Sequence, residues 1–287
     1  MTTIAHKVPA DGHAGSPTRV RRSFNAPLVA GIGILSVLVA MAIFAPLLTP
    51  YGPTAQDLGG ALAAPSPQHP LGTDSLGRDV WSRLLFAGRI DLFIAFVAII
   101  PPLVIGSLLG IVAGYYGGVI DSLITGMVDL VQAFPYYVLI IALVFILGAG
   151  VSSIVVAVGL VAWVSYARIL RGEVIAAKNH EYVLAARAAG FRDARILLRH
   201  IGPNVATHAL VYAMSDIVVI VTGIVTLGYL GLGVPPPTPD WGTMISDGQT
   251  FMTTHWHLAT IPGLAVVVTG LGFSLLGDGL AQLLSPE

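Results

Sequence analysis

Five long stretches of this chain carry no charged side chain, and no other feature constrains its fold more. They cover residues 23–56, 92–120, 130–167, 217–239 and 248–277. Each is long enough, at about 1.5 Å per helical residue, to cross a hydrocarbon core of about 30 Å. Because the stretches are continuously apolar and do not alternate, they predict transmembrane α-helices and disfavour a β-barrel. Composition agrees, since 10% of the 287 residues are charged, against about a quarter in soluble domains.

The stretch 130–167 is long enough for two crossings, with a turn at Gly148 to Ser152. We therefore predict an all-α membrane protein with six spans, near 27–48, 92–114, 127–147, 152–170, 205–227 and 258–279. Basic residues before the first span could belong to a cleaved signal peptide. The span is longer than the apolar region of such a peptide, about 7–15 residues, so we expect it to be retained.

The distribution of Lys and Arg predicts the orientation of the spans. With a cytoplasmic amino terminus, three of the 14 cationic residues lie outside, namely Arg78, Arg83 and Arg89. The other eleven then lie inside: Lys7, Arg19, Arg21, Arg22, Arg168, Arg171, Lys178, Arg187, Arg192, Arg195 and Arg199. This bias favours a cytoplasmic location for both termini. The chain then divides into a disordered tail (1–24), a first span with an extracytoplasmic loop (25–90) and a core domain (91–283).

Two outer segments are rich in Pro and Gly. The first is the loop 49–91, and the second is "GYLGLGVPPPTPDWG" at 228–242. Consecutive prolines cannot extend a helix, so the second segment is predicted to be stiff and extended. Either the two segments cap the mouth of a pathway, or they are plain connecting loops.

The most charged segment is "EYVLAARAAGFRDARILLRH" at 181–200. Its first half has little side-chain bulk, and Gly190 predicts a break between two short helices. In the second half Arg192, Arg195 and Arg199 share one helical face, and Pro203 is expected to end the segment. Such a pair of helices either docks on a soluble partner or lies on anionic lipid.

"AARAAG" followed by "HIGPN" resembles the EAA loop of bacterial ABC import permeases, with matches at Ala185, Ala186, Gly190 and Pro203. Leu184, His200 and Gly202 depart from that pattern. From about His69 to Pro286 the chain resembles the C-type permease subunit of dipeptide, oligopeptide and nickel importers. The similar motifs, in the family's order, are "HPLGTDSLGRDVWSRL", "GYYGGVIDSLI", "DLVQAFP", "EYVLAARAAGF", "RHIGPN", "YLGLGVPPPTPDWG" and "LLGDGL".

The resemblance implies a type I ABC importer permease fold (MetI-like) in a bacterial inner membrane. It also implies a coupling helix at about 181–190 that seats in a cytoplasmic ATPase. The coupling residues are then Glu181, Tyr182, Ala185, Ala186, Arg187, Gly190 and Pro203. The implied partners are a second homologous permease, ATPase subunits and an extracytoplasmic peptide-binding protein docking near 69–90 and 228–250. The docking candidates are Asp74, Gly77, Arg78, Asp79, Pro236 and Trp241.

The chain carries no motif for chemistry of its own. Its two lysines, Lys7 and Lys178, lie outside any G-x-x-x-x-G-K-[ST] loop, so ATP and Mg are expected on partner subunits. There is no Cys, H-E-x-x-H or G-x-S-x-G, and neither enzymatic activity, a cofactor nor a nucleic-acid partner is expected. His255 and His257 alone fall short of the three or four ligands of a metal site, so no metal is expected. Trp256, like Trp241, is expected in an aromatic belt at the membrane surface.

Polar residues inside apolar stretches are the candidates for a transport pathway. Asp216 lies in the middle of the fifth predicted span, where a carboxylate is costly, and His208 and Pro135 are further candidates. Asp216 either lines the pathway or forms an interhelical hydrogen bond. It could also be the coupling acid of an ion-driven secondary transporter. Asp121 and Asp129 are expected to anchor loops or to pair with nearby arginines. Glutathione and nickel chelates remain alternative substrates.

Overall fold

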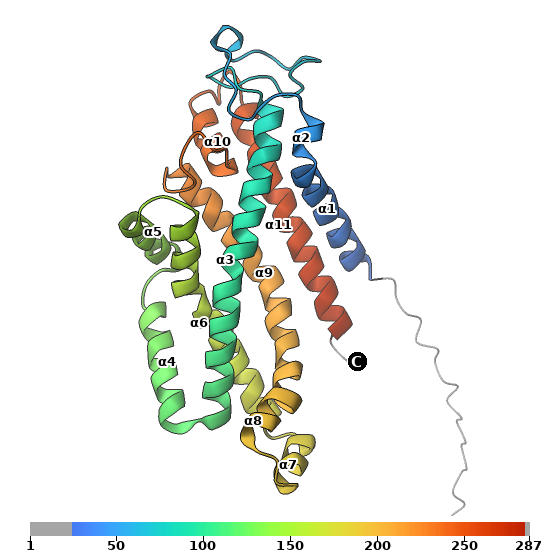
Figure 1. Ribbon diagram of the computed structural model, residues 1–287, viewed down its shortest axis with the longest axis vertical. Helices are drawn as coiled ribbons and strands as arrows, with labels where there is room; N and C mark the ends of the chain where they lie inside the picture. Colours follow the sequence, from blue (N-terminus) through green and yellow to red (C-terminus); the bar gives the residue numbers. More distant parts are fainter. Residues whose placement is uncertain (1–24, 285–287) are drawn as a thin grey trace, which may run out of the picture.

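The computed structural model describes residues 25–284. The predicted tail 1–24 lies outside the described residues. The elements are α1 (Ala26–Ile43), α2 (Ala45–Leu48), η1 (Leu58–Gly60), α3 (Val80–Tyr116), α4 (Gly118–Gln132), α5 (Tyr136–Leu147), α6 (Val151–Ala177), α7 (Glu181–Ala188), α8 (Asp193–Ile196), η2 (Leu197–Ile201), α9 (Gly202–Tyr229), α10 (Trp241–Gln249) and α11 (His257–Leu284). In Figure 1 the long helices run side by side, with α7 at one end and the loops before α3 at the other.

Five helical stretches are long and apolar enough to cross a membrane: α1, α3, α6, α8 to α9, and α11. The predicted third span, 127–147, is divided into α4 and α5, which are bent by 84° relative to each other and together are long and apolar enough for a broken span or a re-entrant loop. Pro135, which precedes α5, has a β-region backbone (φ −60°, ψ 129°) and lacks the N–H that would continue α4. The predicted turn at Gly148 to Ser152 is confirmed between α5 and α6.

The second span begins earlier than predicted. Asp79 caps α3 by accepting a hydrogen bond from the Ser82 amide at 2.7 Å, so the helix starts at Val80 and not near residue 92. Arg83 and Arg89 therefore lie on α3 and not in a loop. The helix also runs through residue 90, where we expected a domain boundary.

The α3–α6 pair, with α9 against it, forms the centre of the bundle. Gly106 and Gly110 allow α3 and α6 to approach closely. A Cβ added at Gly106 would lie 2.3 Å from the carbonyl oxygen of Trp163, and one at Gly110 would lie 2.5 Å from that of Ala167. Small residues at helix contacts are typical of membrane proteins. α1 packs mainly on α11 at the side of this centre.

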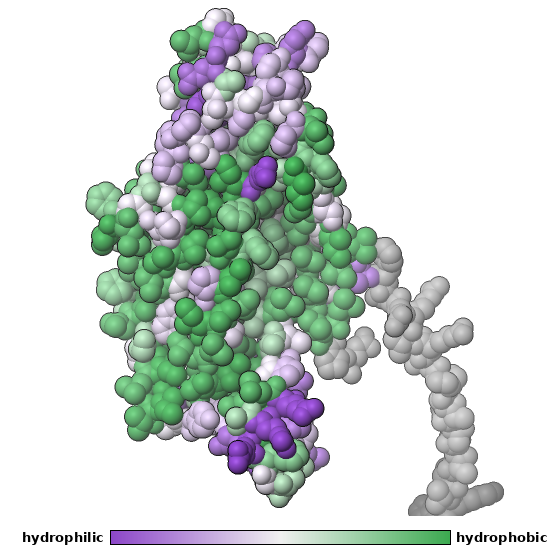
Figure 2. All heavy atoms as spheres, viewed as in Figure 1, coloured by the Kyte–Doolittle hydropathy of each residue, from purple (hydrophilic) through white to green (hydrophobic). Residues whose placement is uncertain are grey.

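The surface divides into three zones along the bundle. Figure 2 shows a broad hydrophobic band between two hydrophilic ends. We call residues 49–79 and 230–256 the loop end, and residues 178–201 the α7 end. The band is the surface that a bilayer would cover, and the two hydrophilic ends would lie in water.

Candidate functional site

The α7 end is the first candidate site, and its two faces differ. Val183 and Ala186 are buried, at 0% and 6% exposure. They pack in a cluster with Leu170 and Val174 of α6 and with Ile196. A set of residues on the other faces of α7 is exposed: Glu181, Tyr182, Leu184, Ala185, Arg187 and Ala188. Of the small residues predicted to face a partner, Ala185 is therefore available, whereas Ala186 is not, because it packs against its own chain.

Gly190 provides the predicted break between α7 and α8. Its φ is +77°, a left-handed conformation that favours glycine. A Cβ at this position would meet no atom within 4 Å, so the requirement for glycine comes from the backbone conformation and not from packing. The predicted break at Gly190 is confirmed, but only α7 is a separate short helix, because α8 runs on through η2 into α9.

Polar contacts tie the α7 end to α3. The Tyr115 hydroxyl donates to the carboxylate of Asp193 at 2.6 Å. The Arg187 guanidinium lies 5.3 Å from the centre of the Tyr115 ring, within the range of a cation–π contact. Tyr115 is itself 7% exposed. Sequence reasoning missed Tyr115, since an isolated Tyr near a helix end carries no spacing signal.

The α7 end is also continuous with α9. η2 is a π-helical turn that joins α8 to α9 without an interruption. The prediction that Pro203 ends the segment is therefore wrong. Pro203 stands in the first turn of α9, where its missing N–H is tolerated. Leu198, within this turn, is 80% exposed.

Near the α7 end, ion pairs link α6 to α4, and a hydrogen bond links the end of α6 to α3. Arg171 binds Asp121 through two contacts, at 2.5 and 2.6 Å, and Arg168 lies 3.6 Å from Asp129. The predicted pairing of these two acids with nearby arginines is confirmed. Lys178 adds a hydrogen bond from its ammonium group to the carbonyl of Gly114 at 3.0 Å.

Asp216 lies inside the bundle, on α9, and is 5% exposed. It accepts a hydrogen bond from the Tyr166 hydroxyl of α6 at 2.9 Å, so the predicted interhelical hydrogen bond is present. The Tyr166 ring in turn packs edge-on against Tyr212, with centroids 4.9 Å apart. The other pathway candidates are at the surface. Pro135 is exposed, and His208 is 55% exposed with its Nε2 3.7 Å from Glu173.

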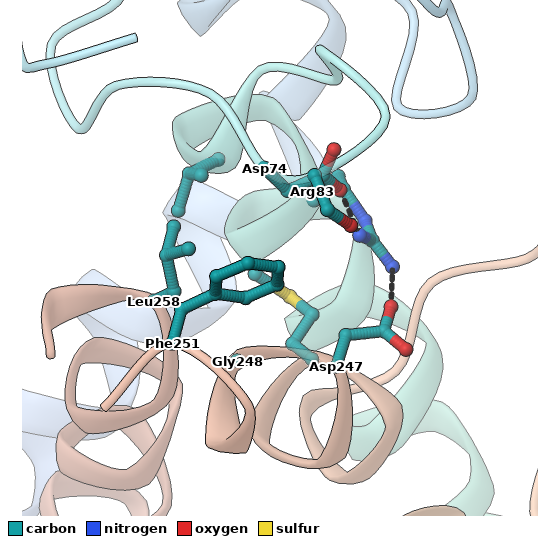
Figure 3. Close-up of a pocket in the computed structure, with 9 residues that line it drawn as sticks. Asp74, Arg83, Asp247, Gly248, Phe251 and Leu258 are labelled. Atoms are coloured by element: carbon teal, nitrogen blue, oxygen red, sulfur yellow. Dashed lines mark hydrogen bonds and ion pairs between the residues drawn. The ribbon is translucent and has the colours of Figure 1, made fainter. Parts of the chain in front are cut away.

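The loop end is held by a charged network, of which Figure 3 shows Asp74, Arg83 and Asp247. Asp74 accepts hydrogen bonds from the backbone amides of Leu76 and Arg78, at 2.9 and 3.0 Å. Its carboxylate also contacts the Arg78 Nε at 2.6 Å and the Arg83 guanidinium. Arg78 reaches Asp247 of α10 at 3.2 Å. Burial raises the pKa of Asp74, but Arg83, Arg78 and the two amides lower it by more, so the pKa lies below its ordinary value.

Trp241 is the centre of a second contact at the loop end. It is 2% exposed, its amide donates to Asp91 at 2.9 Å, and its indole donates to the carbonyl of Leu84 at 3.2 Å. Its ring lies so close to Gly88 that a Cβ there would be 2.8 Å from it. The prediction of an aromatic-belt position is therefore wrong for Trp241. Asp91, which sequence reasoning placed in a loop, instead anchors α10 to α3.

These contacts change the set of docking candidates. Asp74, Gly77, Arg78, Asp79 and Trp241 are buried in the loop end, and Pro236 is exposed. The buried five hold the loop end together and have no free surface for a partner. Trp256 is 60% exposed, and the rings of His255 and His257 are 6.0 Å apart. Within residues 25–284, no group of three or more His, Asp or Glu side chains could hold a metal.

Comparisons with known proteins agree with this architecture. Residues 106–287 match the family described as "Binding-protein-dependent transport system inner membrane component", and residues 24–65 match the "N-terminal TM domain of oligopeptide transport permease C". The dipeptide transport system permease protein DppC of Alkalihalophilus pseudofirmus is 36% identical, over 92% of this chain and 86% of that protein. The oligopeptide transport system permease protein OppC of Bacillus subtilis is 37% identical, over 92% of this chain and 86% of that protein.

Two further proteins widen the comparison. The glutathione transport system permease protein GsiD of Escherichia coli O6:K15:H31 is 39% identical, over 94% of this chain and 88% of that protein. A solved structure of the MetNI methionine ABC transporter in an inward-facing conformation aligns with a TM-score of 0.57 at 17% identity. The alignment covers 71% of this chain and 97% of that one, and this likeness concerns the fold alone.

Proposed function

Since the chain belongs to the inner membrane components of binding-protein-dependent transport systems, we propose that it is the permease subunit of an ATP-driven importer for dipeptides or oligopeptides. The family consists of transport permeases and not of enzymes, and the chain is an integral inner membrane protein. The names of the relatives, which specify dipeptide, oligopeptide and glutathione transport, support a short peptide as the substrate. Glutathione is the alternative that these names also support.

The exposed side of α7 is the observation that carries the proposed coupling role. Its exposed residues, including Glu181, Tyr182 and Ala185, form a surface at the extreme end of the bundle. The opposite side is packed on α3 and α6. A cytoplasmic ATPase that holds the exposed side would therefore move α3, α6 and α9 together. ATP and Mg belong to that ATPase.

In this proposal the α7 end and both termini face the cytoplasm, and the loop end faces outward. The excess of Lys and Arg near the α7 end supports this orientation. A second permease subunit would pack on the exposed apolar side chains of α4 and α5, such as Leu123, Leu130 and Phe145. The peptide-binding protein would dock on exposed parts of the loop end, including Pro236.

Asp216 has a different role in this proposal from the one it would have in an ion-driven transporter. Its hydrogen bond to Tyr166 joins α6 and α9 inside the core, which supports a role in helix pairing. His208 and Pro135 lie at the surface near two hollows of about 340 and 330 Å³. We propose that these hollows become part of the pathway only when the second permease covers them.

Reconstitution tests the function directly. The chain, its neighbouring permease and ATPase subunits are placed in proteoliposomes with ATP inside, and uptake of a labelled dipeptide, tetrapeptide or glutathione is measured with the binding protein outside. We expect uptake that requires both ATP and the binding protein. Uptake by the purified chain alone, driven by an ion gradient, would instead establish a secondary transporter.

A substitution on α7 tests the coupling role. Ala185→Arg adds bulk and charge to the exposed face without touching the buried cluster. We expect substrate-stimulated ATP hydrolysis to fall while the complex still assembles. Ala194→Arg, at an exposed position of α8, is the matched control. Equal stimulation in the two variants would contradict the docking of α7.

A further inference from the structure

A lipid-facing groove lies beside α1, separate from the sites described above. It has a volume of about 530 Å³ and is lined by α1, α3, α9 and α11. Its walls are apolar apart from one residue, and they include Phe93, Phe96, Leu210 and Phe273. Phe93, Phe96 and Leu210 are 62%, 63% and 48% exposed. The groove is therefore open to whatever surrounds the bundle in the membrane.

The exception is Arg89, which lies at one end of the groove. It is exposed, and in the described part of the chain no carboxylate lies within 4.0 Å of its guanidinium. The two other arginines near the loop end, Arg78 and Arg83, are buried and paired with Asp74 and Asp247. Arg89 is thus a cation without an internal partner beside an apolar groove.

The depth of Arg89 fits the surface of the membrane. Met41 and Ala42, near the end of α1, lie against Leu84, Leu85 and Gly88 of α3, so Arg89 is close to the level at which this apolar span ends. The groove continues along α3 to Leu103. The separation of 103 − 89 = 14 residues corresponds to about 21 Å of helix. One leaflet contributes about 15 Å to the hydrocarbon core, so the groove is long enough for a headgroup contact and one lipid tail.

We propose that this groove binds one anionic phospholipid from the leaflet at the loop end. The phosphate lies on the Arg89 guanidinium, which offers paired N–H donors that match phosphate oxygens. One acyl chain lies along Phe93 and Phe96 and against Leu210. A protein helix in the groove would leave Arg89 buried without a carboxylate unless that helix supplied one, whereas a phospholipid supplies both the tail and the anion.

Native mass spectrometry of the complete complex, titrated with phosphatidylglycerol in detergent, tests the proposal. We expect one phosphatidylglycerol bound to this chain, and weaker binding by at least about tenfold in Arg89→Gln, the change that corresponds to about 1.4 kcal/mol. Arg168→Gln removes the same charge from an exposed position of α6 and should bind as the wild type does. Unchanged binding in Arg89→Gln overturns the proposal.

A second variant separates the groove from the charge. Leu210→Trp fills the groove and leaves Arg89 in place, so it should also lower the bound fraction. A photo-crosslinking residue at Phe96 should capture phospholipid in native membranes. Capture of another protein subunit at that position would show that the groove is a protein contact. Unchanged lipid binding in Leu210→Trp would show that the lipid tail does not lie in the groove, and either result overturns the proposal. Lipid binding and crosslinking are measured without transport, so a failure of the lipid proposal would leave the proposed transport function untouched.

Discussion

The contact between Tyr115 and Asp193 should control how firmly α7 and α8 are attached to the bundle. Tyr115→Phe removes the hydroxyl that donates to Asp193 at 2.6 Å and keeps the ring beneath Arg187. A hydrogen bond to a charged group contributes about 1.5–3 kcal/mol. Because Asp193 is exposed and water can replace the lost donor, we expect the lower part of this range or slightly less, about 1–1.5 kcal/mol.

The expected change is local. A loss of about 1–1.5 kcal/mol corresponds to a fivefold to tenfold higher population of detached α7. Hydrogen–deuterium exchange of residues 181–196 in the complete complex should accelerate by that factor, whereas exchange in α6 should not change. Uptake in proteoliposomes should fall relative to ATP hydrolysis, because an ATPase would then move a segment that is less firmly attached to α3.

The neighbouring residue provides the control. Tyr116 is 51% exposed, and Tyr116→Phe removes the same oxygen atom one position along the helix. Asp193→Asn keeps an acceptor for Tyr115 and should give a smaller effect than Tyr115→Phe. If Tyr115→Phe and Tyr116→Phe show the same exchange and the same ratio of uptake to ATP hydrolysis, the attachment does not depend on this hydrogen bond.

Three further outcomes are expected. Gly190→Val forces a β-branched residue into φ +77°, a cost of about 1–3 kcal/mol, so substrate-stimulated ATP hydrolysis should fall although membrane insertion is normal. The pKa of Asp74 is lowered in the folded protein, so the carboxylate should stabilise the loop end fully above roughly pH 5. This stabilisation should be lost as the pH falls through the folded pKa, which lies below 3.8. Pepsin cleavage within 49–79 should therefore rise at such low pH, and Asp74→Asn should remove the dependence of cleavage on pH. Trp241→Ala should lower stability by about 3–5 kcal/mol in thermal unfolding, whereas Trp256→Ala should change it by about 0.5 kcal/mol or less.

Hydropathy predicts the spans because a charge inside lipid is costly, and five of the six predicted spans correspond to spanning helices. Hydropathy does not register direction, so it gave no sign of the 84° bend between α4 and α5. The start of α3 was missed for another reason. Arg83 and Arg89 suggested a loop, although Asp79 directly before the apolar Val80 is a helix-start signal.

The candidate sites show the same limit. Val183 and Ala186 are three residues apart, so helical periodicity alone could have placed Ala186 on the buried face of α7. The burial of Trp241 could not be predicted, because its partners Asp91 and Leu84 are 150 and 157 residues away in sequence. Contacts of that range depend on how the helices pack, and a single sequence carries no spacing signal for them.

The π-helical turn of η2 has a geometric consequence for the direction of α7. Ile196 and Ile201 are five residues apart and both fully buried, whereas a regular α-helix would turn them about 140° from each other. The wider turn therefore sets the angle around the axis of α9 at which the hairpin formed by α7 and α8 projects. Deleting one residue from 197–201 would rotate α7 and α8 by about 100° around the axis of α9. No single side-chain replacement could produce that rotation.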